Sequence, residues 1–339
     1  MKALYLEAVG ADLVLKEVPT PSDLSPDEVL VQTELTGICY RDILTTRGDF
    51  PRTRLPVILG HEIGGRIVKV GSAVTDFKEG DRVASLIYQP CGRCEYCLSG
   101  RENLCRSKKT FGEDVDGSYA EFVKVDRGAL VKAPEGVSAA GLAISACVTG
   151  MLLHAFRKRA GLKPGETVLV TGAGGGVGVH AVQIAKALGA RVIAATSSEW
   201  KEASIRKLGA SEVVVWKEAF ADKVKKLTDG RGVDVVLESV GGPTFSESIK
   251  STAPGGRMIV VGNVLPSPIQ FQLGVLILKE LSVIGSISSV KQDVEDALRL
   301  TVDGRIKPVV HEVLPLADAQ MGHRLMSGRA SLGRIMLRP

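Results

Sequence analysis

The stretch Thr171-Gly172-Ala173-Gly174-Gly175-Gly176-Val177-Gly178 decides the fold of this 339-residue chain. An apolar run, Thr167–Val170, precedes it, and a helical pattern of apolar residues follows it as far as Gly189. This order predicts a strand, a tight glycine turn and a helix. Such a turn lets the backbone approach a pyrophosphate, whose charge meets the free N–H groups at the start of the helix. The stretch therefore indicates a dinucleotide site.

The glycine turn is not a strict G-x-G-x-x-G, because Ala173 stands first in the best register, before Gly175 and Gly178. A glycine-rich loop that serves close packing of helix on strand is the alternative. The residues expected at the dinucleotide are Ala173, Gly175, Gly176, Val177 and Gly178.

Strand and helix patterns alternate after the turn, which predicts an α/β fold with a doubly wound parallel sheet. The expected strands are Arg191–Ala195, Glu212–Val215, Val233–Glu238, Arg257–Val261 and Leu281–Gly285. Ligands of such sheets bind at the carboxyl ends of the strands. The residues expected to face the nicotinamide there are Gly262, Asn263, Val264, Gly285 and Ser286.

The end of the second strand bears on the choice of nicotinamide cofactor. An acidic residue there usually selects NAD, because it bonds the ribose 2′-hydroxyl. This chain instead has Thr196, Ser197 and Ser198, followed by Lys201. Hydroxyls and a lysine suit a 2′-phosphate and favour NADP(H). The alternative, which is compatible with that role, is that a serine caps the next helix and the lysine is solvated.

Composition excludes several classes of function. The net charge of +5 is small and no Lys/Arg-rich run stands out, so no nucleic-acid partner is expected. The amino end, Met1–Leu6, predicts a strand rather than a signal peptide, and no apolar stretch has the length of a membrane span. We therefore expect no membrane association and a cytoplasmic location.

Four cysteines form the most specific local pattern, C-x2-C-x2-C-x7-C. Thiolates at this short spacing suit a closed, tetrahedral structural zinc site. Two disulfides are the alternative, which a cytosolic location disfavours. The four residues are Cys91, Cys94, Cys97 and Cys105.

A second group of possible zinc ligands lies earlier, in Gly37–Asp42 and Gly60-His61-Glu62. With Gly65, Gly71 and Val74, the latter segment matches the zinc-containing alcohol dehydrogenase signature. From these residues the whole chain resembles the medium-chain dehydrogenase/reductase family. Three further segments look more like the archaeal acryloyl-CoA reductases of that family: Cys39-Tyr40-Arg41-Asp42, Cys147-Val148-Thr149-Gly150-Met151 and Pro243-Thr244-Phe245. The resemblance implies a β-rich GroES-like catalytic domain over 1–148 and 290–339, with the structural-zinc lobe at 91–105. It also implies a Rossmann domain over 149–289 and a homotetramer.

The resemblance also implies a catalytic zinc held by Cys39, His61 and Cys147, with Glu62 as an occasional further ligand. Asp42 would orient the ligand histidine. For Cys147 alone, a small buried side chain in a helix start is the alternative. Arg334 is expected either to reach the cofactor pyrophosphate or to be a solvated or paired arginine.

The chain departs from alcohol-oxidising relatives at the proton relay. Where those enzymes have a Ser or Thr and then a His, it has Arg41 and Leu44. Two reactions remain open: hydride transfer between NADP(H) and a ketone or alcohol, with reduction favoured, and reduction of an activated C=C in an enoyl substrate. Zinc or Arg41 would stabilise the enolate in the second reaction. A non-catalytic protein that binds zinc and a dinucleotide is an alternative of another class.

Overall fold

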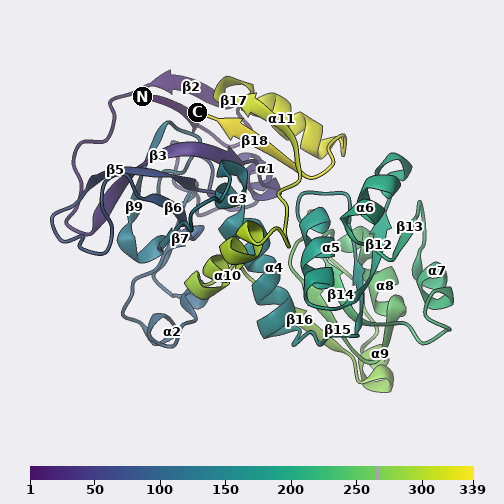
Figure 1. Cartoon of the computed structure of the whole chain (residues 1–339). Coiled ribbons are helices and arrows are strands. Elements are labelled where there is room, and N and C mark those ends of the chain that lie inside the picture. The colour runs from purple at the N-terminus through teal and green to yellow at the C-terminus, as the bar shows by residue number, and fades with distance from the viewer. Residues whose placement is uncertain (265–267) are drawn as a thin grey trace. The chain divides into compact units, whose positions relative to one another are not determined.

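The computed structural model describes residues 1–264 and 268–339. The chain forms two compact units, each described here by itself. Unit 1 comprises Met1–Met151, Ser288–Gly304 and Val310–Pro339, and unit 2 comprises Leu152–Ile287 and Arg305–Val309. Figure 1 shows both units, with the β-rich unit 1 carrying the two chain ends.

Unit 1 is built mainly of antiparallel strands, because short apolar runs alternate there with turn residues. Its main sheet has the order β10-β6-β5-β3-β18-β17, and β9 also pairs with β3. The strands of this sheet are β3 (Glu28–Gly37), β5 (Gly64–Val70), β6 (Arg82–Ser85), β9 (Phe122–Asp126), β10 (Leu130–Lys132), β17 (Val310–Pro315) and β18 (Arg334–Arg338). The carboxyl-terminal β18 pairs antiparallel with β3, with Met336 opposite Gly37, so the chain returns to its first domain.

Two small sheets and five helices complete unit 1. The order β2-β1-β4 joins β1 (Lys2–Leu6), β2 (Val14–Glu17) and β4 (Val57–Ile58), and β7 (Tyr88–Gln89) pairs with β8 (Lys109–Thr110). The helices are α1 (Tyr40–Arg47), α2 (Glu95–Leu98), α3 (Ala139–Ala143), α10 (Lys291–Val302) and α11 (Ala319–Ser327). A π-helical turn, Ser145–Gly150, follows α3 and carries Cys147. Two apolar clusters fill the unit, one around Val29 and Ile67 and the other around Leu4 and Ile335.

Unit 2 contains a six-stranded parallel sheet of order β13-β12-β11-β14-β15-β16, which confirms the predicted doubly wound fold. The strands are β11 (Thr167–Val170), β12 (Arg191–Thr196), β13 (Glu212–Val215), β14 (Val233–Glu238), β15 (Thr252–Val260) and β16 (Ser282–Gly285). The helices are α5 (Gly178–Ala187), α6 (Glu202–Leu208), α7 (Ala221–Lys226), α8 (Gly242–Ser251) and α9 (Leu273–Lys279), and a short α4 (Met151–Leu153) lies at the boundary of the units. Helices cover the two faces of this sheet, as Figure 1 shows.

Residues 305–309 belong to unit 2, whereas the sequence places them in the GroES-like domain. The reason is their hydrogen bonding to α5. The side-chain amide of Gln183 donates to the carbonyl of Lys307 at 3.0 Å and accepts from its N–H at 2.9 Å. His180 accepts from the N–H of Val309 at 3.1 Å, and Arg305 donates to the carbonyl of Ala187.

Candidate active site and metal centres

The four cysteines of the lobe converge on one point. Their sulfur atoms all lie within 4.8 Å of one another, with 3.5 Å between Cys94 and Cys97 and 3.9 Å between Cys91 and Cys97. A tetrahedral zinc with bonds of ~2.3 Å needs sulfur atoms about 3.8 Å apart. Backbone N–H bonds, above all that of Cys97, lower the pKa of Cys94 to about 6, which favours the thiolate that a metal requires. None of the six cysteines is in a disulfide, so Cys91, Cys94, Cys97 and Cys105 fit a structural zinc.

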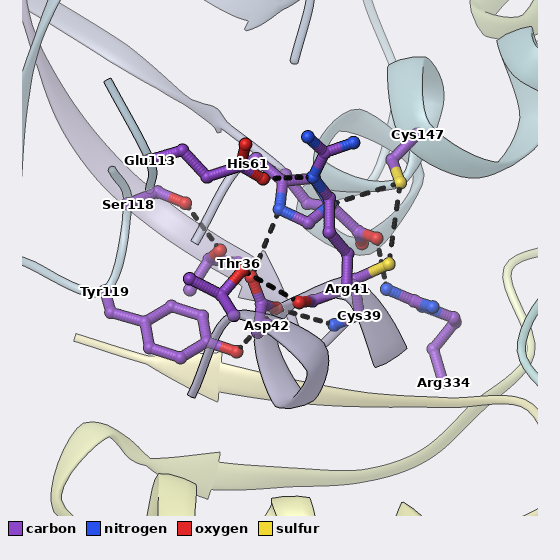
Figure 2. Close-up of polar contacts among 12 residues, drawn as sticks. Thr36, Cys39, Arg41, Asp42, His61, Glu113, Ser118, Tyr119, Cys147 and Arg334 are labelled. Carbon is purple, nitrogen blue, oxygen red and sulfur yellow. Dashed lines mark hydrogen bonds and ion pairs between the residues drawn. The ribbon is translucent and has the colours of Figure 1, made fainter. Parts of the chain in front are cut away.

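The second cluster draws its residues from three distant parts of unit 1. Cys39 immediately precedes α1, His61 follows β4, and Cys147 lies in the π-helical turn. The sulfur atoms of Cys39 and Cys147 are 3.9 Å apart, and Nε2 of His61 lies 3.4 Å from Cys147 (Figure 2). These separations are again those of a tetrahedral site. The cluster can therefore hold a metal ion.

Asp42 fixes the orientation of His61. Its Oδ1 lies 3.1 Å from Nδ1 of His61, which leaves Nε2 directed at the two sulfurs. Its Oδ2 accepts from the backbone N–H of Cys39 at 2.8 Å and from the hydroxyl of Tyr119 at 2.9 Å. Burial works against the charge of Asp42, but His61 and the Cys39 N–H prevail and hold its pKa below the usual range. The hydroxyl of Tyr119 is a contact that the sequence did not predict.

Glu62 and Arg334 form a buried ion pair beside the sulfurs. Nη2 of Arg334 donates to Oε1 of Glu62, and the two side chains are 4% and 0% exposed (Figure 2). Of the two roles expected for Arg334, the structure shows the paired one, and a contact with the cofactor pyrophosphate stays a prediction. Oε2 of Glu62 has no partner among the described residues, and it lies within 4.8 Å of the ligand atoms of the cluster. A buried acceptor in that position suits an additional metal ligand.

Arg41 and Leu44 occupy the relay positions on α1. Arg41 donates through Nε to Glu113, and its guanidinium carbon lies 4.7 Å from the ring centroid of Phe50. A guanidinium held in this way stays charged and cannot accept a proton near neutral pH. Leu44 is half-buried and offers no exchangeable proton. The site therefore lacks a relay hydroxyl and imidazole at these two positions.

The glycine turn of unit 2 has the geometry that the sequence predicts. Val177 precedes the first residue of α5, Gly178. A Cβ on Gly178 would come within 2.3 Å of the carbonyl oxygen of Gly172 and 2.5 Å of Cα of Ala173, so only glycine fits. The N–H of Gly175 closes the turn onto Gly172, and the carbonyl of Gly176 contacts Nδ1 of His180 at 2.7 Å.

The other predicted cofactor residues gather at the same edge of the sheet. Gly262, Asn263 and Val264 follow the end of β15, while Gly285 ends β16 and Ser286 follows it. A Cβ on Gly241, in the turn after β14, would meet Oδ1 of Asn263 at 2.4 Å, so these turns pack closely. The hydroxyl of Ser286 is buried and has no partner among the described residues.

The segment after β12 lies against the glycine turn. Thr196 ends the strand, and its hydroxyl accepts from the N–H of Ser198 at 3.2 Å. Ser197 follows Thr196. Ser198 is the residue before a short 3-10 helix, and its side chain makes no capping bond to that helix. Lys201 is buried, and a Cβ on Gly174 would come within 2.4 Å of its Cδ. Lys201 and the turn are thus neighbours.

Among the described residues, no helix is long and apolar enough to cross a membrane.

Comparison with known proteins agrees with these features. The alcohol dehydrogenase GroES-like domain family matches residues 25–135, and the zinc-binding dehydrogenase family matches residues 176–303. Acryloyl-coenzyme A reductases of Sulfurisphaera tokodaii and Metallosphaera sedula are 43% and 42% identical to the chain, over 100% and 99% of both chains. A solved NAD-dependent alcohol dehydrogenase superposes with a TM-score of 0.93 at 35% identity, with all of both chains covered. The chain belongs to the zinc-containing alcohol dehydrogenase family of medium-chain oxidoreductases, whose members use zinc and a nicotinamide cofactor.

Proposed function

We propose that this protein is a zinc- and NADPH-dependent reductase of an activated C=C bond conjugated to a carbonyl, as in an enoyl thioester. The observation that carries the proposal is the occupation of both relay positions by Arg41 and Leu44. Alcohol oxidation needs a group that accepts the hydroxyl proton, whereas reduction of a C=C bond places its proton on carbon and does not use that relay. The two reductases that are 43% and 42% identical to the chain support an enoyl substrate.

The residues of unit 1 hold the metal and position the carbonyl. Cys39, His61 and Cys147 would bind zinc, and Glu62 offers a further oxygen. Zinc in this site supplies a Lewis acid for a carbonyl oxygen, and bound NADPH supplies the hydride. Asp42 keeps Nε2 of His61 directed at the metal. Arg41 provides a fixed positive charge, because Glu113 and Phe50 hold its guanidinium in place.

Reduction of a ketone is the second candidate. The cluster of three ligands with a buried extra carboxylate has the donor set that alcohol dehydrogenases use to polarise a carbonyl. Ketone reduction is alcohol oxidation in reverse and would use the same relay to deliver its proton, so the missing relay favours the first candidate over this one. The two candidates differ in the atom that receives the hydride, which is the β-carbon of the enoyl group or the carbonyl carbon of the ketone.

The preference for NADP(H) rests on the segment after β12. In place of an acidic residue this segment has Thr196, Ser197 and Ser198. Lys201 lies against the glycine turn, which would receive the phosphates. Positive charge and hydroxyls favour a 2′-phosphate. The change Ser197→Asp should therefore weaken binding of NADPH and spare that of NADH. Equal binding of both cofactors by the unmodified protein would contradict this preference.

Assembly into a homodimer, and further into a tetramer, is the proposed quaternary state. β16 is an edge of the six-stranded sheet, and a bare edge of this kind pairs readily with another strand. The preceding α9 exposes apolar side chains, with Leu273 69%, Ile277 76% and Leu278 87% accessible. A second copy of the chain would cover both features.

The decisive experiment is consumption of NADPH with acryloyl-CoA, 2-cyclohexenone and an aromatic ketone, each in parallel with oxidation of a primary alcohol. We expect reduction of the two alkenes to be fastest and alcohol oxidation to be feeble. Oxidation of NADPH by the ketone alone would select the second candidate. Intact NADPH binding with no turnover of any compound would select a non-catalytic protein.

The relay argument has its own test. The double change Arg41→Thr with Leu44→His should raise alcohol oxidation, since positioned general bases contribute ~10²–10⁴ in rate. Brisk oxidation of ethanol or benzyl alcohol by the unmodified protein would refute the argument.

A further inference from the structure

The corner at the start of α10 contacts both the structural-zinc lobe and the segment of Cys147. This corner, Ser289–Lys291, lies in unit 1 and its Ser289 is fully buried. The hydroxyl of Ser289 donates to the carbonyl of Ala146 at 3.0 Å. Because a peptide unit is planar, a bond to the carbonyl of Ala146 also orients the nitrogen of Cys147. The corner thus holds the peptide that carries a candidate ligand of the catalytic metal.

Two side chains next to lobe cysteines hydrogen-bond to the corner, one from β7 just before the lobe and one from the lobe itself. Tyr88 lies three residues before Cys91, is 1% exposed and donates its hydroxyl to the carbonyl of Ser289 at 2.7 Å. Glu102 lies three residues before Cys105, and its Oε1 accepts from the N–H of Lys291 at 2.9 Å. The carboxylate thereby satisfies an N–H at the first turn of α10, where a negative charge is favourable. Both contacts therefore start close in sequence to a cysteine of the four-thiol cluster.

The segment around Cys147 needs outside support. It is a π-helical turn, a less stable conformation than the α-helix and one that occurs mostly as single turns at functional sites. A Cβ on Gly150, at the end of this turn, would lie 3.2 Å from Cβ of Ser289, so the corner packs directly against the turn. A shift of the corner would therefore move the peptide of Cys147.

We propose that the structural-zinc lobe, with the strand just before it, positions Cys147: Tyr88 donates to the corner, Glu102 accepts from it, and Ser289 of the corner donates to Ala146. Tyr88, Glu102 and Ser289 are positioning residues on this path. The lobe then has two roles: it stabilises unit 1, and it sets the place of one thiolate in the other metal cluster. This inference does not depend on which substrate the enzyme reduces.

The first test uses the zinc-loaded protein and Ser289→Ala, which removes only the hydroxyl. Zinc release to a colorimetric chelator is followed while iodoacetamide alkylates each cysteine as it becomes free, and the sites are mapped by mass spectrometry. We expect Cys39 and Cys147 to be alkylated roughly 3- to 10-fold faster, the factor that one buried hydrogen bond contributes to an equilibrium. Alkylation of the four lobe cysteines should not change.

The matched control is Ser85→Ala, since Ser85 is also a buried serine of unit 1 and donates to the carbonyl of Leu86. Its hydroxyl bonds to the next residue of its own segment, so the change should leave the alkylation of Cys147 at the rate of the unmodified protein. Equal rates in Ser289→Ala and Ser85→Ala, with circular dichroism unchanged in both, would overturn the proposal.

The second test addresses the lobe. Glu102→Ala removes the acceptor of the Lys291 N–H, whereas Glu102→Gln retains an oxygen at that position. We expect Glu102→Ala to expose Cys147 as Ser289→Ala does, Glu102→Gln to restore most of the protection, and the double variant Glu102→Ala with Ser289→Ala to be no worse than the stronger single one. Faster alkylation of the lobe cysteines alone, or fully additive effects on Cys147, would show that the lobe acts only on stability.

Discussion

The hydroxyl of Tyr119 should stabilise unit 1 more than an ordinary tyrosine hydroxyl does. Tyr119 is fully buried and donates at 2.9 Å to Asp42, a carboxylate that is itself 2% exposed. Burial and the neighbouring charge of Asp42 raise the pKa of Tyr119 well above its usual value, so its hydroxyl remains a donor. A hydrogen bond to a charged acceptor contributes about 1.5–3 kcal/mol, and one between neutral groups about 0.5–1.5 kcal/mol. The change Tyr119→Phe keeps the ring and removes only this bond.

The comparison variant is Tyr88→Phe, because Tyr88 is equally buried but donates to the neutral carbonyl of Ser289. Urea unfolding followed by circular dichroism, at equal zinc content, should show a loss of unfolding free energy about twice as large for Tyr119→Phe. His61 should also hold its metal less firmly, because removing a partner of a ligand histidine typically costs about 10- to 100-fold in affinity and Tyr119 acts one step further away. The reasoning is refuted if Tyr119→Phe costs no more than Tyr88→Phe.

Three further predictions concern the metals, pH and assembly. Elemental analysis should find two zinc ions per chain. Cys94→Ser should chiefly lower thermal stability, with a smaller loss of activity through the position of Cys147, and Cys39→Ser should chiefly remove activity. The bonds from Arg82 lower the pKa of Glu34 below its ordinary 4.5, so this pair stabilises the folded state above pH 4.5 and the benefit disappears as pH falls through the lower folded value. Arg82→Met should therefore cost at most about 1 kcal/mol at pH 7 and less in acid, measured by urea unfolding at both pH values. Leu278→Asp should shift the protein toward monomers in light scattering at micromolar concentration, and an unchanged mass would exclude α9 from the interface.

The sequence predicted the local elements well where a pattern is short and regular. The glycine turn, the helix after it and the strands Glu212–Val215 and Val233–Glu238 are present as expected. The spacing of the lobe cysteines was sufficient to bring four sulfurs together, because the ligands lie within one short segment. Close packing at Gly178 likewise follows from a local turn.

Contacts between distant segments could not be predicted in the same way. Tyr119 reaches Asp42 across 77 residues and Glu113 reaches Arg41 across 72, and no local pattern links these partners. The sequence leaves two roles open for Arg334, because it shows the charge of this side chain but not the residue that it contacts. Its partner, Glu62, lies 272 residues away and meets it only because β18 pairs with β3. The π-helical turn at Cys147 has no known pattern of period 3.6 or 2 that would reveal it.

The charges around the catalytic cluster give a reason, independent of any resemblance, to expect a cation there. Arg41 and Glu113 compensate each other, and Arg334 compensates only one of the remaining acids. With both thiols ionised, the negative groups are the half-buried Cys39 and Cys147 and the buried Asp42 and Glu62. Charges removed from water are tolerated in a protein only when they are paired or coordinate a metal. A divalent ion held by Cys39, His61 and Cys147 would remove most of this imbalance, and Oε2 of Glu62, which has no partner among the described residues, could add a further ligand. In the reaction proposed above, such an ion would face the oxygen of the enolate, and neither Arg41 nor Leu44 offers a base for the proton of an alcohol.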